Sequence, residues 1–243
     1  MRHLHSQLGA WWRTGTNNCH GHRCTVAAVE LQIDAILFDN DGVLVDSHEQ
    51  VELAWRQLTA EFGLDYDLLA GELVGVRAGD TLGRFLEPAE AVRAVDRLED
   101  LEVALAEFVR PLAGAIELID RLPAEAWTIV TSASLRLATA RWTAAGIEIP
   151  SRIVTAEDVS HGKPDPEPFL TAAHRLGVDP VRCLVFEDSS SGGAAAAAAG
   201  ATVVAVGSQP WPTQSVARVR DLTQVTVAYD AALGAIDVHL APQ

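Results

Sequence analysis

The sequence predicts a three-layer α/β domain with a mainly parallel sheet and a small inserted α-helical cap. Short apolar runs, the first of them at residues 35–38, alternate with stretches of helical period, as in a sheet buried on both faces. Acidic or hydroxyl side chains follow these runs directly. Residues 48–110 carry only helical patterns and interrupt this alternation. We therefore expect an α/β core formed by residues 31–47 and 111–243, with residues 48–110 as the cap.

Composition excludes several classes of protein. Of the 243 residues, 49% are hydrophobic and 21% charged, as in a folded soluble chain, and no apolar run reaches the roughly 18 residues of a membrane span. The net charge is −15, so we expect neither a nucleic-acid nor a membrane partner. Three cysteines do not make a disulfide framework, which favours the reducing cytoplasm. We expect a monomer.

Residues 1–30 differ from the rest of the chain. They show no helical period and contain no acid before Glu30. We interpret them as a disordered extension or as the result of a start codon assigned too far upstream, with Val26 or Val29 a natural first residue. A metal cluster at Cys19–Cys24 and an organelle transit peptide are the less favoured alternatives.

The first predicted strand ends at two acids, Asp39 and Asp41, which are followed by Gly42. Two carboxylates at the end of a buried strand are costly unless they are solvated or neutralised by a cation. In an open α/β sheet, ligands bind beyond this end of the strands, and Gly42 lets the chain turn sharply there. The alternative is a plain strand-to-loop transition capped by acids.

The cap is predicted to contain two main helices. Their apolar stripes are Val51, Ala54, Trp55, Leu58 and Phe62, ended by Gly63, and Val92, Val95, Leu98, Leu101, Leu105 and Phe108. A polar loop at residues 75–81, which includes Arg77, connects these helices. It is either a substrate contact or a plain helix connection. The hinges are expected at residues 45–48 and 110–114.

A second strand, residues 127–131, leads to Ser132 and a helix with Leu135, Ala138, Trp142 and Ala145 on one face. A hydroxyl beside a helix N-terminus makes an anion site, to which Ser132 and the Ala133 N–H are assigned. Thr131 is the alternative hydroxyl, and Ser134 is the candidate N-cap. Three prolines around Lys163 hold this lysine in one place.

A further strand at residues 183–186 ends at Glu187 and Asp188, and a helix of small residues follows. Residues 201–206 and, more weakly, 225–228 complete the predicted strands. Phe169, Ala172, Ala173 and Leu176 form the buried stripe of the preceding helix.

Four segments in this order resemble the motifs of the haloacid dehalogenase superfamily. The first, Asp39-Asn40-Asp41-Gly42-Val43-Leu44-Val45-Asp46-Ser47, is similar to D-x-D-G-x-(L/I)-x-D-(S/T). The others are the strand ending near Ser132, the G-K-P-x-P segment at residues 162–166, and Glu187-Asp188. The resemblance implies a Rossmann-like core with a helical cap, and it is strongest for sugar and polyol phosphatases.

The family's chemistry implies a role for each matched residue. Asp39 is the expected nucleophile, which forms an aspartyl phosphate, and Asp41 the general acid/base. The expected cofactor is Mg²⁺, held by Asp39, Asp188 and the backbone carbonyl of Asp41, with Glu187 in or near the ligand shell. The expected phosphate and substrate contacts are Asn40, Arg77, Ser132, Ala133 and Lys163.

We therefore expect a Mg²⁺-dependent phosphatase of a small phosphorylated metabolite, in particular a sugar or polyol phosphate. A phosphotransferase of the β-phosphoglucomutase type is the alternative. Such mutases carry a hinge histidine whose position here is Val51, and His48 is the candidate substitute. A dehalogenase would leave Asp41 without a role, and a phosphonatase would need a cap lysine, which residues 48–110 lack. Because all the motif residues are present, an inactive binding protein is disfavoured.

Overall fold

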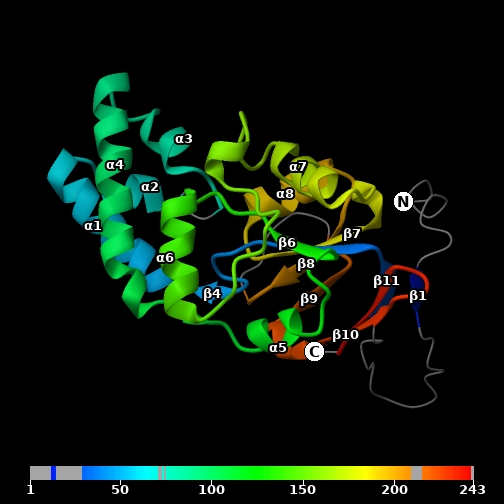
Figure 1. Cartoon of the computed structure of the whole chain (residues 1–243). Coiled ribbons are helices and arrows are strands. Elements are labelled where there is room, and N and C mark those ends of the chain that lie inside the picture. Colours follow the sequence, from blue (N-terminus) through cyan, green and yellow to red (C-terminus); the bar gives the residue numbers. More distant parts are fainter. Residues whose placement is uncertain (1–11, 15–28, 71–72, 74, 209–214, 242–243) are drawn as a thin grey trace, which may run out of the picture.

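A computed structural model of the chain describes residues 12–14, 29–70, 73, 75–208 and 215–241. Its centre is a parallel sheet of five strands in the order β6-β3-β7-β8-β9 (Figure 1). In chain order the strands are β3 (Ala35–Phe38), β6 (Trp127–Ile129), β7 (Cys183–Glu187), β8 (Thr202–Val206) and β9 (Ala217–Val219). The predicted mainly parallel α/β fold is confirmed, and β9 is an additional strand that the sequence pattern did not predict.

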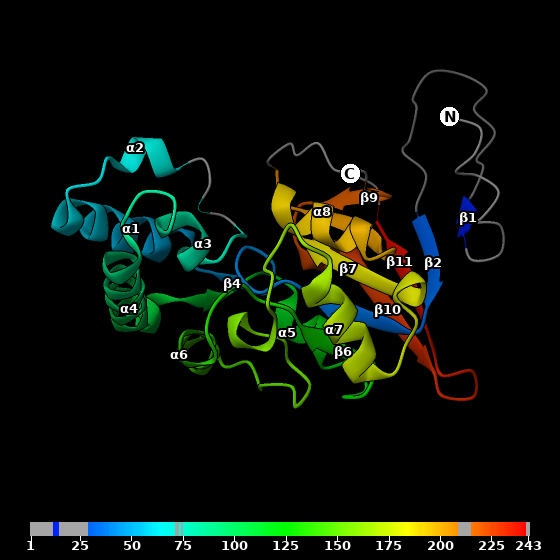
Figure 2. The same cartoon turned by 90° about the horizontal axis from the view of Figure 1, so that it is seen from above.

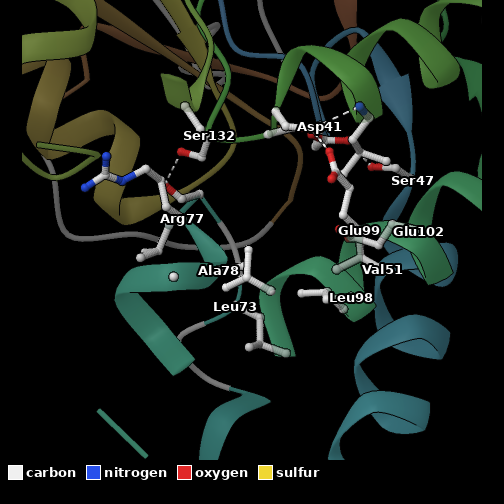
Figure 3. Close-up of a pocket in the computed structure, with 18 of the residues that line it drawn as sticks. Asp41, Ser47, Val51, Leu73, Arg77, Ala78, Leu98, Glu99, Glu102 and Ser132 are labelled. Carbon is white, nitrogen blue, oxygen red and sulfur yellow. Dashed lines mark hydrogen bonds between the residues drawn. The ribbon is translucent and has the colours of Figure 1, made fainter. Parts of the chain in front are cut away.

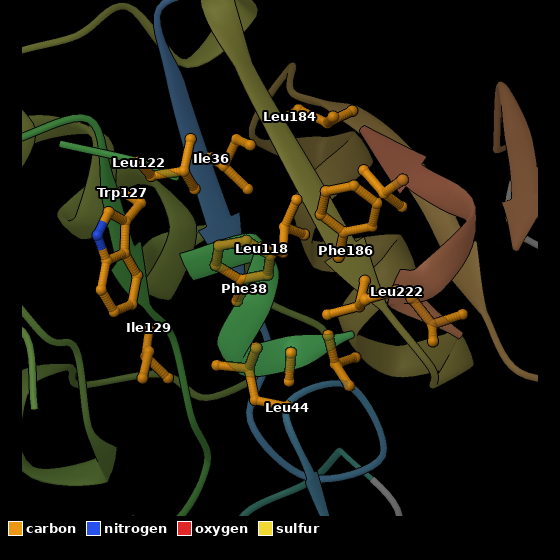
Figure 4. Packing of buried hydrophobic residues seen from close by; sticks show 14 of the residues in the cluster. Ile36, Phe38, Leu44, Leu118, Leu122, Trp127, Ile129, Leu184, Phe186 and Leu222 are labelled. Carbon is orange, nitrogen blue, oxygen red and sulfur yellow. The ribbon is translucent and has the colours of Figure 1, made fainter. Parts of the chain in front are cut away.

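Two layers cover the parallel sheet, one on each face (Figure 2). Alternate residues of β3 point to opposite sides, so that Ala35 and Leu37 pack with α7 (Glu167–Leu176) and α8 (Ser190–Ala198). Ile36 and Phe38 face the other side, where α5 (Ala115–Ile119), α6 (Leu135–Ala145) and a second sheet close the larger core (Figure 4). Phe38 stacks on Phe186 there, with ring centroids 5.5 Å apart.

The second sheet is antiparallel, with strand order β1-β2-β11-β10. Its strands are β1 (Trp12–Thr14), β2 (Val29–Ile33), β10 (Val225–Asp230) and β11 (Ala235–Leu240). The weak strand predicted at residues 225–228 thus belongs to this sheet. Strand β1 and the start of β2 fall within the predicted extension, whereas the rest of it, including residues 19–24, lies outside the described residues.

The inserted helical segment leaves the core through β4 (Val45–Asp46) and returns through β5 (Arg110–Pro111), which pair antiparallel at the predicted hinges. The helices between them are α1 (His48–Phe62), α2 (Tyr66–Leu69), α3 (Ala78–Leu82) and α4 (Pro88–Leu105). They enclose a small apolar core of their own. Short 3-10 turns occur at residues 106–108, 156–158, 180–182 and 222–224. Within the described part of the chain, no helix is long and apolar enough to cross a membrane.

Two predicted helical stripes were partly wrong. In α4 the buried line runs through Ala91, Ala94, Leu98 and Leu101, so that Val92 is exposed. Phe108 is exposed as well, but it lies in the 3-10 turn that follows α4. Each residue of an α-helix turns about 100° from the last, and this rotation carries Val92 away from a line that starts at Ala91. In α6, Leu135 is likewise exposed, and the charged Arg141 lies on the buried face instead.

Candidate active site

Three strand ends bring the predicted motifs to one edge of the parallel sheet. The register pairs Phe38 of β3 with Ile129 of β6 and with Phe186 of β7, so that the residues just beyond them share this edge. One carboxylate oxygen from each of Asp39, Glu187 and Asp188 lies within 4.8 Å of the others. The acids that the sequence placed at separate strand ends therefore form one cluster.

Lys163 extends into this cluster from the proline-rich loop. Its Nζ donates to Oδ1 of Asp39, to Oε1 of Glu187 at 2.7 Å and to the carbonyl of Val130 at 3.2 Å. Burial alone would lower the pKa of Lys163, but the carboxylates of Asp39 and Glu187 outweigh it and raise this pKa. The two carboxylates therefore favour the charged form of the lysine beside Asp39.

Glu187 uses both of its oxygens within the protein. While Oε1 accepts from Lys163, Oε2 accepts from the backbone N–H of Ser189 at 2.8 Å and from its hydroxyl at 2.9 Å. Space here is restricted, since a Cβ on Gly192 would lie 1.5 Å from Oε1. Glu187 is thus held in place as the partner of Lys163, which leaves Asp39 and Asp188 to face a ligand.

Asp188 has the features of a cation ligand. Its Oδ1 is buried without a hydrogen-bond partner among the described residues, whereas Oδ2 lies 3.3 Å from Nε2 of His48. Burial raises the pKa of Asp188, and burial likewise raises that of Asp39 well above its usual range, against the opposing effect of Lys163. Carboxylates crowded in this way are stabilised by a bound cation, and the donor set suits Mg²⁺.

The turn after β3 brings the backbone close to this cluster. Gly42 has a φ of +81°, and a Cβ at this position would lie 2.0 Å from Oδ2 of Asp188. Both the conformation and the space therefore require glycine.

Asp41 is held by side chains from three parts of the chain. Its Oδ1 accepts from the hydroxyl of Ser47 at 2.5 Å and pairs with Nη1 of Arg141 at 2.9 Å. Its Oδ2 accepts from the amide of Asn40 at 3.2 Å, and the Asn40 oxygen accepts in turn from Nε1 of Trp142 at 2.6 Å. The side chain of Asn40 is therefore engaged within the protein at both ends.

The hydroxyls after β6 divide into separate roles. Ser132 lines the cavity and donates to the carbonyl of Gly75 at 3.1 Å, while the N–H of Ala133 donates to Oγ1 of Thr131 at 3.0 Å. Ser134 caps α6, because its Oγ accepts from the N–H of Leu137 at 3.1 Å, as its candidate role predicted. Phosphate binding by Ser132 and Ala133 stays a prediction, and it would require both to exchange these partners.

Arg77 lies on the polar loop of the cap, beside the loop that carries Lys163. Its guanidinium binds both oxygens of Asp80, at 2.8 and 3.1 Å, and donates to the carbonyls of Val159 at 3.3 Å and Ser160 at 3.1 Å. The structure thus places Arg77 in the cavity wall as a cap-to-core contact and does not pair it with the acids at the strand ends.

A cavity of about 620 Å³ lies between the cap and the end of β3, where Asp39 and Asp41 line it (Figure 3). Asp41 and Ser132 form part of its core side, and Val51 and Leu98 project from α1 and α4 on the cap side. Three cap carboxylates, Asp80, Glu99 and Glu102, also line it. It is large enough for a small metabolite whose phosphate points to the strand ends.

Sequence reasoning missed Arg141 and Glu102, which form a buried ion pair beside Asp41, with Nη2 of Arg141 3.0 Å from Oε1 of Glu102. A signal for both was present. Arg141 comes three residues after Ala138, and this spacing places it on the apolar face of α6. Glu102 comes four residues after Leu98 and therefore lies on the apolar face of α4. A charged residue at such a position must have a buried partner.

Comparison with known proteins agrees with this geometry. Residues 33–200 match the family of haloacid dehalogenase-like hydrolases. The chain is 36% identical to hexitol phosphatase A of Escherichia coli (strain K12) over 206 residues, which cover 81% of this chain and 95% of the relative. It is 32% identical to glycerol-1-phosphate phosphohydrolase 2 of Saccharomyces cerevisiae, with 68% and 71% covered. The crystal structure of β-phosphoglucomutase from Clostridium difficile superposes with a TM-score of 0.70 at 25% identity, covering 80% of this chain and 93% of that one.

Proposed function

The chain belongs to the family of haloacid dehalogenase-like hydrolases, and we propose that it is a Mg²⁺-dependent phosphatase of a sugar or polyol phosphate that works through an aspartyl phosphate. The curated relatives at 36% and 32% identity are named as a phosphatase and a phosphohydrolase, which supports a phosphoric monoester hydrolase with a small phosphorylated metabolite as its substrate. The observation that carries the proposal is the buried contact of Lys163 with Asp39 at the strand ends, next to a second acid, Asp41, on the same turn.

Asp39 is the nucleophile in this proposal. One of its oxygens attacks phosphorus, so that an oxygen–phosphorus bond forms while the bond to the leaving alcohol breaks. Asp41 gives its proton to the leaving oxygen, which departs as the alcohol, and afterwards takes a proton from the water that hydrolyses the acyl phosphate. Lys163 opposes the effect of burial on the pKa of Asp39 and holds this carboxylate in place, and the charge of the lysine also offsets charge on the phosphoryl oxygens.

Asp39, Asp188 and the backbone carbonyl of Asp41 are the proposed ligands of Mg²⁺. Bound there, the ion would offset the repulsion between the carboxylates and a phosphate dianion. The buried Oδ1 of Asp188 has no hydrogen-bond partner in the described part of the chain, which supports this assignment because a buried carboxylate oxygen without a donor is otherwise costly. Glu187 supports the site through Lys163.

The charges of the cavity favour a substrate with one phosphate and a neutral remainder. Both arginines of the described lining are already bound to carboxylates, Arg77 to Asp80 and Arg141 to Asp41 and Glu102. The cap carboxylates Glu99 and Glu102 are likewise paired, with Arg136 and Arg141, so the described lining leaves no arginine for a second phosphate. A polyol or sugar monophosphate fits this lining better than a bisphosphate.

The phosphotransferase alternative is supported by one observation. His48, at the start of the first cap helix, lies 3.3 Å from Asp188 and lines the cavity, near where a mutase needs its hinge histidine. A mutase must also bind a bisphosphate, which the charges of the lining disfavour. The enzyme should be incubated with β-glucose 1-phosphate, Mg²⁺ and a trace of glucose 1,6-bisphosphate. We expect inorganic phosphate as the product, and glucose 6-phosphate accumulating much faster would establish the mutase.

The proposed function is tested by steady-state phosphate release from sugar and polyol monophosphates with Mg²⁺, compared with the same reactions in EDTA. We expect release with Mg²⁺ alone and a loss of at least about 10³-fold in Asp39→Asn, since the amide is nearly isosteric but a poor nucleophile. Asp46→Asn, on the exposed side of the first hinge strand, is the matched control. Activity of Asp39→Asn within tenfold of wild type would refute the covalent mechanism. We further propose a cytoplasmic monomer, which light scattering on the purified chain and cell fractionation would check.

A further inference from the structure

We propose that Arg141 is a positioning residue that makes the placement of Asp41 depend on the cap. The inference rests on the proposed function, in which Asp41 is the general acid/base. Arg141 lies on α6 with 3% of its side chain exposed. Its Nη1 is 2.9 Å from Oδ1 of Asp41, and its Nη2 is 3.0 Å from Oε1 of Glu102. One guanidinium thus joins the proposed acid/base in the core to a carboxylate of the cap.

The two carboxylates come from parts of the chain that the hinges separate. Asp41 belongs to the turn after β3, before the first hinge, and Glu102 lies near the end of α4 in the cap (Figure 3). Helix α4 packs against α6, which brings Glu102 to Arg141. If α4 moved away, Arg141 would therefore lose its contact with Glu102, and Asp41 would remain as its carboxylate partner.

Burial makes this contact strong enough to control geometry. Arg141 and Glu102 have 3% and 10% of their side chains exposed, so water does not replace either partner readily. Losing one member of a buried charged pair leaves the other uncompensated, which the structure must relieve by moving side chains. Asp41 has two neutral donors besides Arg141, Ser47 and Asn40, so it would remain in the site with its orientation less restricted.

The placement of Asp41 should affect the rate of phosphoryl transfer most for substrates whose leaving group must be protonated. An alcohol leaves poorly as an alkoxide and depends on protonation by Asp41, whereas p-nitrophenolate leaves readily without it. The value of kcat/KM reports steps only up to transfer of the phosphoryl group to Asp39. Misplacement of Asp41 should therefore lower kcat/KM for alkyl phosphates much more than for p-nitrophenyl phosphate.

The chain offers a matched control for the loss of a cap-to-core ion pair. Arg136 lies on the same helix and pairs with Glu99 at 3.3 Å and Asp100 at 2.8 Å, both on α4. Its side chain is 54% exposed, and within the described residues it contacts the carboxylates of Glu99 and Asp100 rather than that of Asp41. Arg136→Met thus removes an arginine between the same two helices without touching the acid/base.

The experiment compares kcat/KM for glycerol 1-phosphate and sorbitol 6-phosphate with that for p-nitrophenyl phosphate, all with saturating Mg²⁺. For Arg141→Met we expect the alkyl-to-aryl ratio to fall at least about tenfold, a part of the usual general-acid contribution. Arg141→Lys should restore part of that loss, and Glu102→Gln should lower the ratio about threefold or more. Arg136→Met should leave it within about twofold of wild type.

A ratio within twofold of wild type in a folded Arg141→Met would overturn the proposal, and so would an equal fall in Arg136→Met. If Arg141→Met does not fold, as judged by circular dichroism and Tm, Glu102→Gln decides by the same ratio, because it keeps the shape of the buried pair. The proposed function itself would be refuted if the wild-type protein released no phosphate from any of the three compounds. A change in the alkyl-to-aryl ratio alone does not test that function.

Discussion

Lys163 and Glu187 form an ion pair that is buried from solvent, with Nζ 2.7 Å from Oε1. The same ammonium group donates to Asp39, so that two buried carboxylates share one cation. A third acid, Asp188, adjoins them with an oxygen that has no partner among the described residues. The cluster therefore carries more negative than positive charge, and its stability and its chemistry should both respond to a divalent cation.

Replacing Lys163 by methionine should destabilise the protein most when metal is absent. The substitution leaves Asp39 and Glu187 buried without their cation, at a cost of about 3–5 kcal/mol in the free energy of unfolding. Mg²⁺ bound at Asp39 would offset part of this loss. Urea denaturation of both proteins in EDTA and in Mg²⁺ measures the difference. An identical loss in the two conditions would place the metal elsewhere.

The same variant should also be a poor catalyst. Loss of one preorganised charge next to the phosphoryl group should lower transition-state stabilisation by about 2–4 kcal/mol, measured as kcat/KM.

Asp188→Asn should weaken Mg²⁺ binding before it affects folding. The amide keeps the shape of the side chain but removes the charge that holds a hard cation, so the Mg²⁺ concentration for half-maximal phosphate release should rise at least about tenfold. Asp100→Asn, on the exposed surface of α4, is the control and should not shift the titration. Overlapping titration curves for wild type and Asp188→Asn would remove Asp188 from the metal site.

Glu102 should make stability depend on pH. Burial, only partly offset by Arg141, raises the pKa of this carboxyl to about 7 from an ordinary value of 4.5. Between those two values the unfolded chain releases the proton that the folded chain keeps, so stability is highest below this window and falls as pH rises through it. The free energy of unfolding of the wild type should therefore fall by about 3 kcal/mol relative to that of Glu102→Gln between pH 4.5 and 7. Urea denaturation of both proteins at pH 5, 6, 7 and 8 checks this, and parallel stability curves would contradict it.

Removal of residues 1–28 should leave kcat/KM within about twofold and Tm within a few degrees of wild type. The part of this segment that the structure describes is β1, which pairs only three residues with β2 at the edge of the antiparallel sheet. The remaining strands of that sheet bury Leu31 and Ile33 against the main core without it. Failure of the truncated chain to fold would show that the N-terminal segment is part of the domain.

Local sequence patterns were sufficient for the main elements of the fold. The buried strands of the parallel sheet were predictable because a run such as residues 35–38 is apolar on both faces, which only a sandwiched strand requires. Glycines 63, 146 and 177 ended their helices in the left-handed conformation, as expected of a residue without a Cβ. Which residues of α4 form its buried face could not be predicted to within one position. Alanine and valine are both readily buried, and the packing of the neighbouring helix selects which of them faces the core.

The sequence by itself determined which residues meet at the strand ends, because parallel strands bring the residues that follow them to one edge whatever the rest of the chain does. Asp39, Glu187 and Asp188 were identified in this way, and Lys163 was identified by its proline-rich loop and the family motif that this loop resembles. Only the tertiary structure decided the partners of these groups. The packing of α4 on α6 paired Arg141 with Glu102 beside Asp41, and the docking of the cap loop brought Arg77 to the carbonyls of Val159 and Ser160. Such contacts join residues far apart in sequence, and their geometry depends on how whole helices dock, which no local pattern encodes.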